Sequence, residues 1–147
     1  MKFSARSQYA LEALLALAEA PEGEPVQVRS IADGQGIPVR FLEQIMAALK
    51  KTGLVRSVRG ARGGYMLATE PGLIRVGQVL QAVEGPFQEE WEKSAHGDQA
   101  PAASRAVHAL WQEAQDAVRN LFECITLRDL VERKRKLEGS RGIMFHI

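Results

Sequence analysis

Residues 30–68 read SIADGQGIPVRFLEQIMAALKKTGLVRSVRGARGGYMLA, and this stretch decides the fold. Ser30, with Asp33 three positions later, has the S-x-x-D form of a capping box and predicts a short helix that starts there. Gly36 ends that helix, and Pro38 lies where the first turn of a new helix tolerates proline. Two helices joined by so short a turn predict a helix-turn-helix.

The second of these helices, residues 38–51, is amphipathic. Its apolar residues have the i, i+3, i+4, i+7 spacing of a face that points into a core. They are Leu42, Ile45, Met46 and Leu49. The opposite face carries Arg40, Gln44, Ala47 and Lys51, with Glu43 at its margin.

A hairpin is predicted directly after this helix, which Gly53 ends. The β-rich runs 54–58 and 65–68 flank the segment RGARGG at residues 59–64, whose glycines permit positive φ in the connection. A hairpin in this position is a wing. Further helices over 7–20 and 76–83 and a short strand over 26–28 complete the domain. The predicted fold is mainly α with a small β-hairpin: a winged helix-turn-helix domain, residues 1–84, followed by a long C-terminal dimerisation helix.

The remainder divides into a mobile loop (85–104), dimerisation helices (105–137) and a tail (138–147). A long helix over 105–124 carries an apolar seam with alternating spacings of three and four residues, which is typical of packing against a like helix. The seam consists of Val107, Leu110, Ala114, Ala117, Leu121 and Cys124. A second stripe of Trp111, Val118, Phe122 and Ile125 lies beside it. Two stripes require two partners, so we expect one to pack on the chain's own domain and the other on a second subunit.

The junction after the long helix carries a second capping box. Thr126 and Asp129 predict the start of a short final helix.

Charge points to nucleic acid through its distribution, because the formal net charge is only +1. Between residues 40 and 62 the basic side chains Arg40, Lys50, Lys51, Arg56, Arg59 and Arg62 face one acid, Glu43. Such a stripe is typical of a phosphate-binding surface. No apolar run is long enough to span a bilayer, and a single cysteine forms no disulfide within the chain, so a cytoplasmic protein is expected. The sequence contains no catalytic motif, so an enzyme is not predicted.

Several side chains are candidates for DNA contacts. Recognition helices read bases mainly with their N-terminal residues, and a slim basic hairpin fits a minor groove. The candidates are Arg40, Glu43, Gln44 and Lys51 on the helix, Arg56, Arg59 and Arg62 on the wing, and Lys2 and Arg6 before the first helix. A solvated helix face and a merely solubilising turn are the alternatives.

No metal and no cofactor are predicted. His108 and Cys124 are the plausible soft-metal ligands on the long helix, but sixteen residues separate them, about 24 Å at 1.5 Å per residue. They cannot share one ion within a subunit. A buried, inert thiol is the simpler interpretation of Cys124.

The sequence resembles the winged-helix regulators of the Rrf2 family, the IscR, NsrR and CymR type. The resemblance rests on FSARSQYA at 3–10, IPVRFLEQI at 37–45, GLVRSVRGARGGY at 53–65 and VGQVLQAVEGP at 76–86, extended by HALW at 108–111 and ITLRDL at 125–130. It implies a homodimer formed through the long helix, a palindromic operator and repression, with Glu43 and Arg59 as readers of the major and minor grooves. Cluster-sensing members carry three cysteines between the equivalents of about Trp91 and Arg105, and this chain has none there.

The leading hypothesis is therefore a sequence-specific DNA-binding regulator, with a small-molecule or protein effector acting through residues 86–104. The alternative is a winged-helix interaction module with little affinity for DNA.

Overall fold

The computed structural model describes residues 3–85 and 99–145, with side chains as far as residue 140. Six helices and one antiparallel hairpin lie within these ranges, which confirms the predicted fold class. The helices are α1 (Ala5–Glu19), α2 (Val28–Gln35), α3 (Val39–Lys51), α4 (Val76–Glu84), α5 (Ala102–Cys124) and α6 (Leu127–Phe145). The strands are β1 (Val55–Val58) and β2 (Gly64–Leu67), followed by the short 3-10 helix η1 (Pro71–Leu73).

The core lies between α1, α3 and α4. Leu42, Ile45, Met46 and Leu49 of α3 are all fully buried, as their spacing predicts. They pack with Leu14 of α1 and other apolar residues in one cluster, which α2 and β1 complete. Because this cluster buries one whole face of α3, the helix is held with its polar face outward.

The turn between α2 and α3 follows the prediction, whereas the start of α2 does not. Gly36 adopts the left-handed conformation with φ of 67°, and its N–H donates to the carbonyl oxygen of Ala32. The helix, however, begins at Val28, so Ser30 lies inside its first turn and caps nothing. The strand expected over 26–28 is also reduced to one bridge, between Val26 and Tyr65. Pairing with β2 holds Val26 in place, and the chain turns into α2 directly after it.

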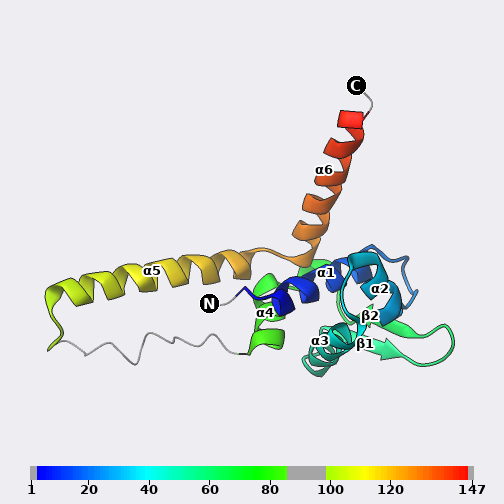
Figure 1. Cartoon of the computed structure of the whole chain (residues 1–147), viewed down its shortest axis with the longest axis horizontal. Coiled ribbons are helices and arrows are strands. Elements are labelled where there is room, and N and C mark those ends of the chain that lie inside the picture. The colour runs from blue at the N-terminus through cyan, green and yellow to red at the C-terminus, as the bar shows by residue number, and fades with distance from the viewer. Residues whose placement is uncertain (1–2, 86–98, 146–147) are drawn as a thin grey trace.

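A main-chain clasp fixes the junction of α5 and α6 to the start of α4. The N–H of Val76 donates to the carbonyl of Ile125 at 2.9 Å, and the N–H of Leu127 donates to that of Ile74 at 2.8 Å. The Arg75 side chain adds a bond of 2.7 Å to the carbonyl of Glu123. Among the described residues, such main-chain bonds attach α5 to the domain at its C-terminal end, and the helix extends well beyond the domain in the other direction (Figure 1).

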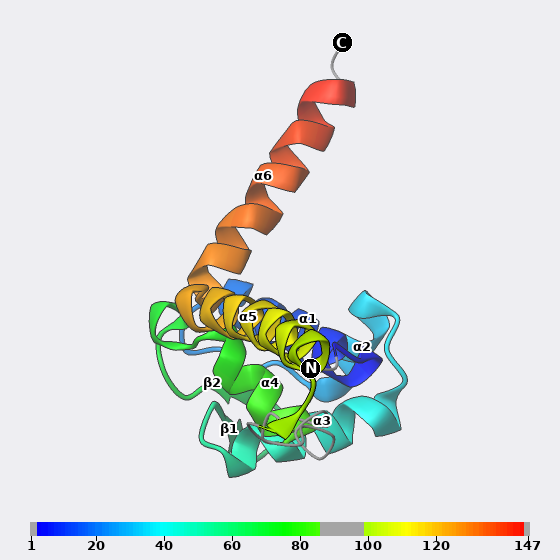
Figure 2. The same cartoon turned by 90° about the vertical axis from the view of Figure 1, so that its left-hand side faces the viewer.

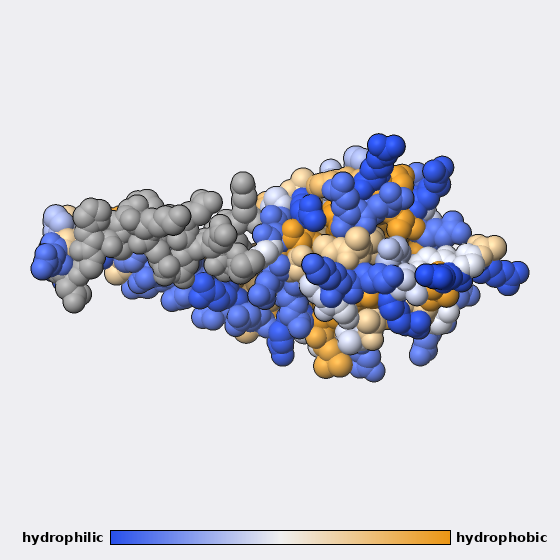
Figure 3. All heavy atoms as spheres, turned by 90° about the horizontal axis from the view of Figure 1, so that it is seen from below, coloured by the Kyte–Doolittle hydropathy of each residue, from blue (hydrophilic) through white to orange (hydrophobic). Residues whose placement is uncertain are grey.

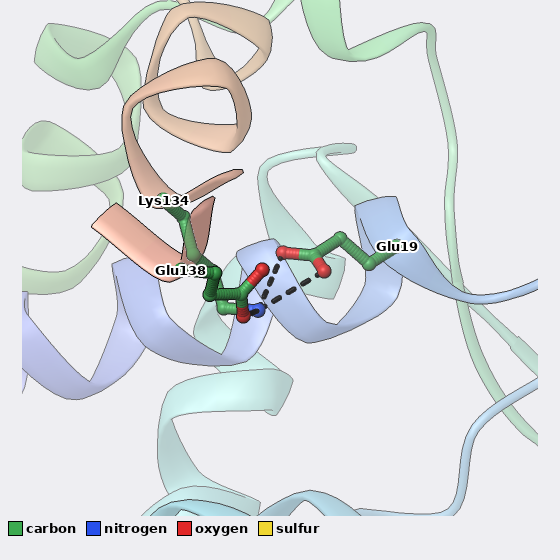
Figure 4. A network of polar contacts seen from close by, with 3 residues as sticks. All are labelled: Glu19, Lys134 and Glu138. Carbon is green, nitrogen blue, oxygen red and sulfur yellow. Dashed lines mark hydrogen bonds and ion pairs between the residues drawn. The ribbon is translucent and has the colours of Figure 1, made fainter. Parts of the chain in front are cut away.

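The final helix α6 is longer than expected. It has 19 residues and includes most of the segment predicted as a tail, and it projects away from the winged-helix domain (Figure 2). Its capping box is confirmed, because Thr126 and Asp129 each accept a hydrogen bond from the other's N–H. Lys134 fixes α6 to α1 through Glu19 at 2.9 Å and also pairs with Glu138 (Figure 4).

The long helix begins earlier than predicted, at Ala102 rather than residue 105. Most of the expected mobile loop, residues 86–98, lies outside the described residues. None of the helices that the structure describes is long and apolar enough to cross a membrane.

Candidate nucleic-acid interface

The outer face of α3 is polar and exposed. Arg40, Glu43, Gln44 and Lys51 are all exposed, as expected from their positions opposite the buried stripe. In the part of the chain that the structure describes, none of the four side chains forms an ion pair or hydrogen bond. The face therefore offers two cations, a carboxylate and an amide, the groups that bind phosphates and base edges.

The wing is a tight hairpin that only glycine can close. A Cβ on Gly63 would lie 2.1 Å from the carbonyl oxygen of Val58, and one on Gly64 would lie 2.4 Å from that of Val26. The N–H of Gly63 donates to the carbonyl of Gly60, so the two central residues, Ala61 and Arg62, form the tip. Arg59 and Arg62 are both exposed at this narrow end of the molecule. The third wing candidate, Arg56, is also exposed but lies within β1 against the sulfur of Met66.

The wing is attached to the start of α2. Val26 and Tyr65 exchange two main-chain hydrogen bonds, of 2.9 and 2.8 Å. The side chain of Gln27 donates to the carbonyl oxygen of Ala61 at the tip, at 3.5 Å. The sequence alone did not predict a role for Gln27, because its hydrogen bond joins residues 34 positions apart and no local pattern indicates such a contact. The consequence is that the wing and the first turn of α2 form one unit.

Hydrophilic side chains cover much of the face that α3 and the wing share (Figure 3). The molecule is seen there from the side on which α3 lies in Figure 1. Two described groups whose pKa values are shifted lie elsewhere, on α6. Hydrogen bonds from Thr126 lower the pKa of Asp129, and hydrogen bonds to Glu138 and Glu19 raise the pKa of Lys134. These two groups stabilise the fold and are not part of the candidate interface.

The N-terminal candidates are less well placed than those of α3. Lys2 lies outside the described residues, and Arg6 is partly buried, with its Nε atom buried and without a hydrogen-bond partner among them. Their segment is fixed by Glu84, the last residue of α4. Its carboxylate accepts hydrogen bonds from Ser4 and from the buried Ser7, the latter at 2.8 Å.

The seam of α5 is uncovered in the single chain. None of the 23 residues of this helix is buried, and Val107, Leu110 and Leu121 are 58%, 67% and 53% exposed. Ala114, Ala117 and Cys124 are exposed as well, so the expectation of a buried thiol is not met in one subunit. Among the described residues, the chain's own domain does not bury this seam.

The second stripe of α5 divides along its length. Phe122 and Ile125 pack against the core cluster, as expected for the partner within the same chain. Further along, Trp111 and Val118 line an open hollow of about 320 Å³ together with Phe3, whose ring stacks on Phe122 at 6.4 Å. The hollow adjoins the exposed seam, because the seam residue Ala114 also lines it.

The described residues do not fit an iron–sulfur cluster. Such clusters are held mainly by thiolates, and the whole sequence contains one cysteine. Within residues 3–85 and 99–140 no three metal-binding side chains of the His, Cys, Asp or Glu type come together. His108 and Cys124 lie near opposite ends of α5.

Comparison with known proteins adds family evidence to this geometry. The profile of the Rrf2 family, described as "Iron-dependent Transcriptional regulator", matches residues 3–133. The regulator IscR of Cronobacter sakazakii is 36% identical over 140 residues, which cover 95% of this chain and 86% of IscR.

Two solved structures share the fold over most of both chains. CymR, the global cysteine regulator of B. subtilis, has a TM-score of 0.76 and 32% identity, covering 90% of this chain and 98% of CymR. IscR of T. potens has a TM-score of 0.75 and 34% identity, covering 91% and 88%. Three observations agree: α3 and the wing are basic and exposed, the fold is shared with these structures, and the family profile matches most of the chain. The chain therefore belongs to the Rrf2 family of transcriptional regulators, which are not enzymes.

Proposed function

We propose that this regulator binds a palindromic operator as a homodimer and represses transcription from it. The observation that carries the proposal is the shared exposed face of α3 and the wing. There, Arg40, Gln44 and Lys51 follow the outer side of a helix whose inner side is fully buried. A helix anchored in this way presents its polar face as a rigid surface, which suits insertion into a major groove about 12 Å wide.

Each exposed group has a chemical role in this proposal. Arg40 suits guanine O6 and N7, Gln44 suits adenine N6 and N7, and Glu43 accepts from cytosine N4. Lys51, at the end of α3, suits a phosphate. Arg59 and Arg62 suit the minor groove, where the negative potential attracts arginine and only a slim element enters.

The homodimer rests on the uncovered seam. A single folded chain leaves Leu110 67% exposed on a helix that projects from the domain, and a like helix from a second copy would cover it. Two-fold symmetry would place two α3 helices for two half-sites, which is the reason for a palindromic operator. An effector, a small molecule or a protein, would then act on the segment between α4 and α5.

The test is a double substitution of the wing tip, Arg59→Ala with Arg62→Ala, measured against DNA selected from a random pool. We expect specific binding to weaken by about 1–3 kcal/mol for each base-reading side chain removed, and the salt dependence to become shallower for each phosphate-binding side chain removed. Arg133→Ala with Arg135→Ala on α6 is the matched control, because it removes the same charge from exposed positions outside the interface.

Three results are informative. Weaker binding by the wing variant with a control like the wild type supports the proposal. An unchanged affinity and salt dependence in the wing variant removes the wing from the interface. A wild-type protein that selects no DNA contradicts the proposal and favours the alternative of an interaction module.

A further inference from the structure

The first turn of α2 carries an arginine that the family resemblance and the α3–wing face leave without a role. Arg29 is exposed and follows Gln27, the residue that donates to the wing tip, by two positions. Three hydrogen bonds connect this segment to β2 and the tip: two between Val26 and Tyr65, and one from Gln27 to Ala61. Arg29 therefore keeps a fixed position relative to the wing.

The guanidinium of Arg29 has no partner in the described chain. Asp33 lies one helical turn away on α2, at the spacing where opposite charges often pair, yet no ion pair joins the two. Other arginines have local roles: Arg75 binds the Glu123 carbonyl, and Arg56 lies against Met66. The first turn of α2 also contains no acidic residue. Among the described residues, therefore, no carboxylate pairs with Arg29.

The geometry of a minor groove gives this charge a target. The groove is about 6 Å wide and is bordered on both sides by a sugar–phosphate backbone. A hairpin that enters it brings the elements alongside it against one of these two backbones. The segment that leads into α2 lies alongside this wing, because Val26 pairs with Tyr65 and Gln27 donates to Ala61 at the tip.

We propose that Arg29 binds the phosphate backbone beside the groove that the wing enters. The proposal rests on the DNA-binding function proposed above and adds a contact from α2, outside α3 and the wing. Such a contact positions the protein on the duplex and reads no sequence, because phosphates are the same at every base pair.

The experiment compares Arg29→Ala and Arg29→Lys with the wild-type dimer on two duplexes, the selected operator and a scrambled duplex of equal length, over a range of salt concentrations. Each phosphate contact contributes about 0.9 to the slope of log affinity against log salt. We expect Arg29→Ala to lower that slope by about two, one contact from each subunit, and to weaken binding to both duplexes by the same factor, roughly sixtyfold at 0.1 M salt. Arg29→Lys keeps the charge and should restore most of the slope.

Arg133→Ala is the matched control, because it removes one exposed arginine from α6. Equal slopes for Arg29→Ala, Arg133→Ala and wild type overturn the proposal while leaving the proposed function intact. Weakening confined to the operator also overturns it, because it would identify a base contact instead. Absence of any DNA binding by the wild type is a different result, which refutes the proposed function itself.

Discussion

Helices α3 and α5 have the same kind of apolar spacing and opposite surroundings. On α3 the four apolar residues of the repeat are completely buried by the chain's own helices. On α5 the seam residues lie in the open, with Leu110 67% exposed. The pattern predicts an apolar contact face in both cases, but it does not show whether a partner lies in the same chain. Burial in the folded subunit shows that the partner of α3 lies in the same chain.

The largest effect is expected where the chain covers its own face. Leu49→Ala should lower the free energy of unfolding by about 2–5 kcal/mol, because it removes a fully buried side chain and leaves a cavity. Denaturant unfolding measures this destabilisation. Leu137→Ala is the control, since Leu137 is 71% exposed, and it should change stability by less than about 0.5 kcal/mol. Similar values for the two variants would contradict the description of α3 as a buried helix.

A charge on the seam of α5 should leave the subunit folded and separate the subunits. Leu110→Asp should turn a dimer into monomers at micromolar concentration and weaken operator binding, because a buried carboxylate at the dimer interface would be costly. Analytical ultracentrifugation measures the assembly, and circular dichroism checks the fold. Leu73→Asp is closely matched, because Leu73 is 68% exposed but lies on η1. A wild-type protein that sediments as a monomer would refute the seam as an interface.

The capping box at the start of α6 should have an effect of about 1 kcal/mol. Thr126→Ala removes the hydroxyl that accepts from the Asp129 N–H, and removal of such a cap typically costs about that much. Thr69→Ala, at an exposed position outside the helices, should be neutral. An equal destabilisation in both variants would show that the Thr126 cap makes no specific contribution to the free energy of unfolding.

The same box gives the protein a sensitivity to acid. Hydrogen bonds from Thr126 lower the pKa of Asp129 in the folded state, so its contribution is present above the unfolded pKa of about 3.9 and is lost as pH falls through the folded value. We expect wild-type stability to fall below about pH 4 more steeply than that of Asp129→Asn. Parallel pH curves for the two proteins would exclude this contribution.

The smallest effect, no change, is expected for the single thiol. Cys124→Ser should keep the wild-type affinity for the operator, and protein purified without oxygen should contain no stoichiometric iron and acid-labile sulfide. The reason is that one thiolate per subunit, near the end of α5 opposite His108, offers too few ligands for a cluster. Stoichiometric iron and sulfide in the wild type would show that other side chains hold a cluster after all.

Local signals decide which elements the sequence can predict. The burial of α3, the turn at Gly36 and the hairpin of RGARGG each depend on neighbouring residues, and all three are present in the structure. The predicted start of α2 is wrong because a capping-box pattern at Ser30 competes with a distant pairing, Val26 with Tyr65. The predicted end of α6 is too early because its polar composition shows no periodic apolar face.

Long-range contacts explain which parts of the candidate site the sequence does not predict. The exposed positions of Arg40, Gln44 and Arg59 follow from local periodicity and turn chemistry. The Gln27–Ala61 and Ser7–Glu84 hydrogen bonds join residues far apart in the sequence, so neither can be read from a local pattern. Which bases these side chains bind stays a prediction.

The clasp at residues 74–76 and 125–127 attaches α5 at one end, so a change in the angle of the helix would pivot there. A helix of 23 residues is about 34 Å long. A tilt of about five degrees at the clasp would therefore carry the far end of α5 through about 3 Å, with no change inside the helix itself. The bonds between Ile74, Val76 and the α5–α6 junction thus affect the position of the far end of α5 more strongly than any single side chain at that end.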